Sequence, residues 1–120
     1  MKRLSLPLVF LLRFVAFAQD GLELHFIDVG QGDAVLIPSP SGQNVLYDGG
    51  RDSGDTLAYL HSVGVQSLDL VIASHADADH IGGLADVVSN YRPRFFMDNG
   101  IPIPTSAELL RTAQSSAAGS

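Results

Sequence analysis

Short apolar segments separated by glycine-rich or polar turns recur along most of the chain. Residues 22–27 alternate between apolar and polar positions, which predicts a half-buried β-strand. Four further segments are short and rich in branched or aromatic residues, which predicts strands at 34–37, 43–47, 68–73 and 95–97.

Helices are expected between and after these strands. Residues 55–61 form a short amphipathic pattern that ends before Gly64, a second helix is expected from about Gly82, and a third around 107–111. Three consecutive strands followed by alternating helices and strands predict an α/β fold, a mixed sheet with helices on its face.

Composition limits the possible partners and cofactors. The chain has 120 residues, a net charge of −6 and no cysteine. This length accommodates one domain at most. Because tight sequence-independent binding to duplex DNA needs many lysine and arginine contacts, an acidic chain is poorly suited to it. The absence of cysteine excludes disulfides and thiolate ligands.

The N-terminus has the layout of a secretory signal peptide. Lys2 and Arg3 precede the apolar segment 4–18, which ends in small residues. This segment is shorter than the ~20 residues of a membrane-spanning helix and contains Arg13. We therefore expect cleavage after Ala18 and a secreted or periplasmic protein with no stable membrane anchor, a retained anchor being the alternative.

These features divide the chain into three parts. Residues 1–18 are the expected signal peptide, and 19–113 the expected domain. Residues 114–120 are small and polar and predict a flexible tail.

Two imidazoles and two carboxylates lie within six residues, followed by paired glycines. His75 and Asp77 project to one side of an extended backbone, and a turn into the next helix directs Asp79 and His80 towards a second point. This spacing suits one or two divalent metal ions. The alternative is that Asp77 or Asp79 caps the helix that follows.

Three ordered motifs carry a resemblance to a known family. Residues 26–34 (FIDVGQGDA), 45–50 (VLYDGG) and 75–84 (HADADHIGGL) resemble the metallo-β-lactamase superfamily, in particular its ComEC-like metallo-hydrolase domains. The resemblance covers about 22–97 and implies an αββα sandwich of which this chain holds the first half.

The resemblance also implies roles for individual residues. His75 and Asp77 would ligate one metal ion, and Asp79 and His80 a second, with a bridging water as nucleophile. Asp79 is the expected catalytic residue, because it would hold a metal and take a proton. The remaining assignments are Asp48 and Asp33 as supports behind the ligands, and Gly82 and Gly83 as the substrate-binding turn. For both aspartates the alternative is an ordinary turn between strands.

Asp77 stands where the superfamily commonly has an imidazole. A carboxylate adds a hard oxygen ligand, which moves the preference away from zinc and towards manganese or magnesium, and zinc and manganese both stay candidates. The glycines at the start of a helix suit an anionic phosphate. The expected substrate is a phosphodiester, such as single-stranded DNA.

Other functions stay open at this level. The superfamily fold also accommodates thioester, lactone and β-lactam hydrolysis. No histidine follows His80, so the ligands of a second half are expected to be absent. The chain is then either a fragment of an active enzyme, or a non-catalytic binding module or degenerate relic. A sheet face including Val35, Ile37, Leu46 and Val71 is expected to lie exposed and to drive association.

The remaining polar residues have weaker functional patterns. His25 alternates with apolar residues, which favours a packed or surface position, and His61 is expected to be exposed. Arg92 and Arg94 flank Pro93 and are expected to be solvated, with contact to a polyanion as the less favoured alternative.

Overall fold

The computed structural model describes residues 21–101 together with Arg111 and Ser115. The expected signal peptide, most of the helix predicted at 107–111 and most of the predicted tail lie outside these described residues. No helix in the described part of the chain has the length and apolar character needed to cross a membrane.

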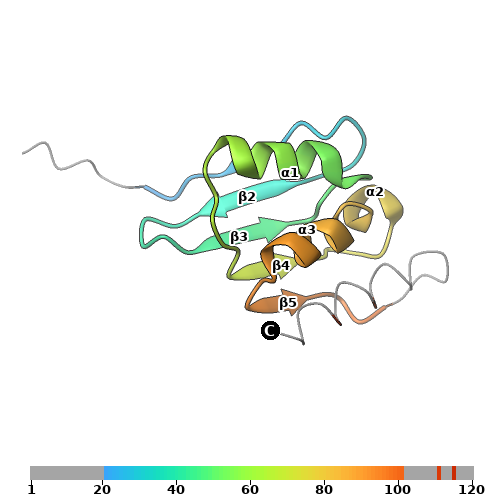
Figure 1. Cartoon of the computed structure of the whole chain (residues 1–120). Coiled ribbons are helices and arrows are strands. Elements are labelled where there is room, and N and C mark those ends of the chain that lie inside the picture. The colour runs from blue at the N-terminus through green and yellow to red at the C-terminus, as the bar shows by residue number, and fades with distance from the viewer. Residues whose placement is uncertain (1–20, 102–110, 112–114, 116–120) are drawn as a thin grey trace, which may run out of the picture.

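Five strands and three helices make up the described fold (Figure 1). The strands are β1 (His25–Phe26), β2 (Val35–Pro38), β3 (Asn44–Tyr47), β4 (Leu70–Ile72) and β5 (Phe95–Met97), and the helices are α1 (Ser53–Ser62), α2 (Ala78–Ile81) and α3 (Leu84–Tyr91).

One mixed sheet contains all five strands in the order β1-β2-β3-β4-β5. The first three strands are antiparallel neighbours, whereas β3, β4 and β5 run parallel. Parallel neighbours need a crossover, which α1 supplies between β3 and β4, and α2 with α3 between β4 and β5. The predicted mixed α/β sheet is confirmed.

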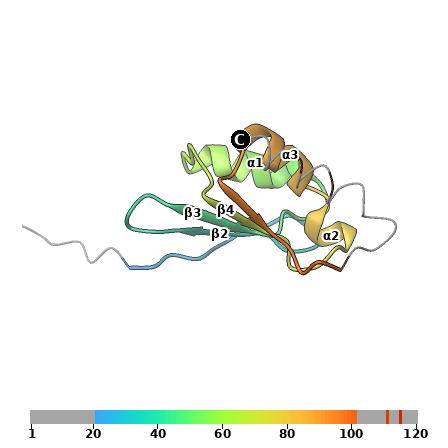
Figure 2. The ribbon, with the colours of Figure 1, turned by 90° about the horizontal axis from the view of Figure 1, so that it is seen from below.

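Helices α1 and α3 pack on one face of the sheet (Figure 2). Under them lies a row of side chains that the strand register places side by side: His25, Leu36, Leu46, Val71 and Phe96. Leu36, Leu46 and Val71 are at most 1% exposed. Leucine and valine side chains buried this completely make this face the core of the fold.

The opposite face carries no described helix (Figure 2). In register, its side chains are all apolar or aromatic: Phe26, Val35, Tyr47, Ile72 and Met97 in one row, and Ile37, Val45, Leu70 and Phe95 in the next. We call these nine residues the bare face. Phe26 is 78% exposed and Phe95 58%.

Two expectations, one on a face of the sheet and one on the length of the first strand, were wrong. Val35 and Ile37 lie on the bare face, but Leu46 and Val71 lie under the helices, because register between strands cannot be read from one strand alone. The helix expected from about Gly82 is α3, which begins at Leu84, whereas the short helix α2 at Ala78–Ile81 was not predicted.

The first strand is also shorter than predicted, with only two paired residues. In its register, residue 23 lies opposite Pro38, which has no N–H to donate to the ladder. Residues before His25 therefore lack a continuous partner strand.

Candidate metal centre

Three loops meet at the carboxyl ends of β1, β3 and β4. They contain residues 28–33, 48–52 and 74–77, and the last of them leads directly into α2. Parallel strands place these ends at one edge of the sheet, where loops commonly carry function. All four predicted metal ligands lie on the third loop and α2.

Asp48 is the buried support of this edge. Its side chain is 1% exposed, and its carboxylate accepts hydrogen bonds from the Ser74 backbone N–H (2.7 Å) and the Ser74 hydroxyl (2.6 Å). His80 Nδ1 donates to the same carboxylate over 2.9 Å. Asp48 therefore fixes both the loop and one predicted ligand, as the support predicted for it requires.

The two histidine rings lie against each other, with centroids 4.0 Å apart. His75 Nδ1 donates to the Ser74 hydroxyl oxygen over 2.8 Å, because that hydroxyl already gives its proton to Asp48. With both Nδ1 atoms engaged as donors, the neutral form of each ring leaves its lone pair on Nε2. This is the arrangement in which histidines bind metals.

Each Nε2 atom lies near one carboxylate oxygen. His75 Nε2 is 3.3 Å from Asp77 Oδ2, and His80 Nε2 is 3.8 Å from Asp79 Oδ1. The extended backbone expected for the loop was wrong, because the chain bends at residues 74–76. The bend nevertheless brings together the pairs that the sequence pattern predicted.

The donor chemistry of these pairs fits a divalent ion, since imidazole nitrogen and carboxylate oxygen are its ordinary ligands. Each pair supplies two donors. Among the residues that the structure describes, no three His, Asp or Glu side chains form a group that could hold a metal ion. The pairs are therefore partial ligand sets.

Asp77 occupies the N-cap position of α2, but its side chain makes no capping hydrogen bond. The carboxylate instead faces His75. Capping therefore does not account for the Asp77 side chain.

The loop at residues 28–33 packs across this edge. Gly50 N–H donates to the Asp33 carbonyl over 2.9 Å, and a side chain at Gly32 would overlap the Asp79 carbonyl oxygen. Asp33 Oδ2 lies 3.7 Å from His80 Nδ1, and its side chain is 69% exposed. The supporting role predicted for Asp33 stays a prediction.

Gly82 and Gly83 meet backbone atoms rather than open space. A Cβ atom at Gly82 would overlap the Arg51 carbonyl, and one at Gly83 would overlap the carbonyls of Gly49 and Asp52. Glycine is required here because two backbone segments approach closely. Their predicted substrate contact stays a prediction.

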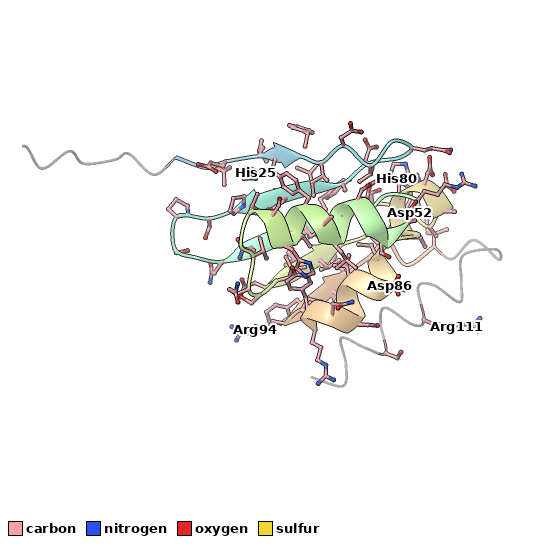
Figure 3. The ribbon with its side chains drawn as sticks, turned by 45° about the horizontal axis from the view of Figure 1, so that its top comes forward. His25, Asp52, His80, Asp86, Arg94 and Arg111 are labelled. Atoms are coloured by element: carbon pink, nitrogen blue, oxygen red, sulfur yellow. The ribbon has the colours of Figure 1, made fainter. Side chains whose placement is uncertain are left out.

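The other polar residues named from the sequence lie elsewhere. His25 Nδ1 is 2.9 Å from the Tyr59 hydroxyl and its Nε2 is 2.8 Å from Glu23, and His61 is exposed. Arg94 lies over the Phe95 ring, 5.2 Å from its centroid, and Figure 3 shows it at the opposite end of the molecule from His80.

Sequence reasoning missed two residues of this edge. Ser74 links Asp48 to His75, and its only sequence signal is a hydroxyl residue immediately before the first histidine. Arg51 donates from its guanidinium to Gln31 Oε1 over 3.1 Å, and an arginine in a glycine-rich loop gave no spacing signal.

The mixed sheet and the paired histidines and aspartates at its carboxyl edge define an α/β protein with the donor chemistry of a metallo-hydrolase. The metallo-beta-lactamase superfamily model matches residues 27–115. The chain belongs to that superfamily.

Two relatives match over most of this chain. It is 34% identical over 88 residues to Recombination protein 2 of Haemophilus influenzae, which covers 68% of this chain and 11% of that protein. It is 26% identical over 116 residues to ComE operon protein 3 of Bacillus subtilis, covering 77% of this chain and 15% of that protein. The predicted resemblance to the ComEC group is confirmed, and the chain spans about a seventh or less of these relatives.

Proposed function

We propose that this chain carries the metal-binding loop of a metal-dependent hydrolase that cleaves phosphodiesters such as single-stranded DNA. The observation that supports this most is the orientation of His75 and His80. Their Nδ1 atoms are hydrogen-bonded to Ser74 and Asp48, and both Nε2 atoms face carboxylates. Members of this superfamily usually bind divalent metals.

Two ions fit the pairing of donors. His75 with Asp77 would hold one ion and His80 with Asp79 the other, with zinc or manganese as the candidates. When bound, such ions polarise a phosphoryl oxygen and lower the pKa of bound water. In this chain Asp48 holds the orientation of His80 and of the Ser74 that contacts His75, and the Asp79 carboxylate would accept the proton of the attacking water.

The substrate class rests on three observations. Asp77 adds a hard oxygen donor of the kind used in phosphate chemistry, and one relative is named Recombination protein 2, a name that points to DNA. The net charge of −6 disfavours tight sequence-independent binding to duplex DNA, which needs many lysine and arginine contacts.

Metal content and hydrolysis test this together. The full chain loaded with manganese is expected to retain two ions after dialysis and to hydrolyse an activated aryl phosphodiester. His75→Ala combined with His80→Ala should abolish both, whereas exposed His61→Ala should change neither. Equal hydrolysis in the double variant would refute the proposal.

A non-catalytic binding module is the second candidate. It is favoured by the lack of a three-donor group in the described part of the chain. Such a module would retain few or no ions after dialysis and would show no hydrolysis. If the chain cleaved a lactone, thioester or β-lactam but not the phosphodiester, the proposed metal site would stand and the proposed substrate would be wrong.

The proposal that the protein is exported rests only on the sequence pattern of residues 1–18. We expect the mature chain outside the cytoplasm with Gln19 as its first residue. N-terminal sequencing of the protein from the periplasm or medium would test this, and an intact Met1 in the cytoplasmic fraction would contradict it.

A further inference from the structure

We propose that Arg51, positioned by Gln31, binds a phosphate group of the single-stranded nucleic acid substrate beside the metal loop. This inference rests on the proposed function. It names Arg51 as the residue of this chain that contacts the phosphate backbone of the substrate. Arg51 is the only lysine or arginine between Arg13 and Arg92.

Arg51 lies within the backbone framework of the candidate metal centre. Its carbonyl packs against Gly82, between α2 and α3. Its guanidinium is held by Gln31, and the neighbouring Gly32 packs against Asp79. Both residues of the Arg51–Gln31 pair are thus anchored by backbone that touches the predicted metal loop.

The guanidinium is available to an anion. Arg51 is exposed, and it forms no ion pair with any described carboxylate, although Asp52 follows it in sequence. Asp52 instead uses its carboxylate to cap α1 by accepting from Gly54 N–H. An arginine has five N–H donors, and one hydrogen bond to an amide leaves its charge and most donors free.

A phosphate is the ligand that this arrangement suits best. A guanidinium presents paired N–H groups that match two phosphate oxygens, and Gln31 limits its freedom before binding. The surrounding loops contribute aspartates and no other cation, so Arg51 supplies the one fixed positive charge against an anionic strand. A neutral ester or lactone would gain nothing from it.

The test measures binding of a fluorescein-labelled oligothymidylate to the full chain by anisotropy, with and without Mn²⁺, across a salt series. Arg51→Gln is expected to weaken binding about tenfold and to reduce the salt slope by about 0.7, the loss of one phosphate contact. Arg51→Lys should recover part of the affinity, and Gln31→Ala should weaken it two- to threefold.

Arg94→Gln is the matched control, because it removes the same charge from an exposed arginine at the far end of the sheet. Equal affinity in Arg51→Gln and Arg94→Gln, or no binding by the unaltered chain, would overturn the inference. Metal retention and hydrolysis are measured separately, so loss of those with intact Arg51-dependent binding would refute only the proposed hydrolase.

Discussion

The two faces of the sheet are both apolar, yet the described helices cover only one of them. Strands β2, β3 and β4 supply Leu36, Leu46 and Val71 to a face packed by α1 and α3, and the same strands supply Ile37, Val45 and Leu70 to a face with no described helix. Hydrophobicity therefore marks what a strand is able to bury, whereas burial depends on a partner element. Stability should respond to the covered face and association to the bare one.

The largest expected effect separates two neighbours on β3. Leu46 is fully buried, and Val45, which points to the bare face, is partly exposed. Leu46→Ala should lower the free energy of unfolding by about 2–5 kcal/mol through lost burial and a cavity, and Val45→Ala by less than about 1 kcal/mol. Denaturant unfolding monitored by circular dichroism measures both, and equal losses would contradict the two-face description.

The next effect lies at the carboxyl edge of the sheet. Asp48→Ala removes the acceptor of three hydrogen bonds and leaves the Ser74 N–H and His80 Nδ1 without it, which should cost about 2–4 kcal/mol. Asp33→Ala, at an exposed carboxylate, should cost less than about 0.5 kcal/mol. An unchanged free energy of unfolding in Asp48→Ala would show that Asp48 does not hold the loop.

This edge also shows how far the sequence specified the structure. The sequence predicted β5 from three consecutive apolar residues, and it predicted the pairing of His75 with Asp77 from their spacing, although a bend at residues 74–76 brings the two together rather than an extended backbone. The Asp48 contacts to Ser74 and His80 span 26 and 32 residues, so no local pattern contained them. Likewise, the side of the sheet taken by Leu46 depended on register with β2, which one strand does not encode.

A smaller effect is expected for association through the bare face. A contiguous exposed apolar surface of this kind promotes self-association. Phe26→Ser combined with Phe95→Ser should shift the chain towards monomer in light scattering at high concentration, with little change in unfolding midpoint. A monomeric unaltered chain with a sharp melting transition would show that the bare face does not associate.

The smallest expected effect is a gain at the end of α3. The hydroxyl of Tyr91 is buried without a hydrogen-bond partner among the described residues, and burial raises its pKa. Because an unpaired buried hydroxyl is unfavourable, Tyr91→Phe should leave stability unchanged or raise it by about 1 kcal/mol. The ring packs against the covered core, so Tyr91→Ala should destabilise instead. A loss of stability on Tyr91→Phe would mean that the hydroxyl makes a favourable hydrogen bond, and it would contradict the description of this group as unpaired.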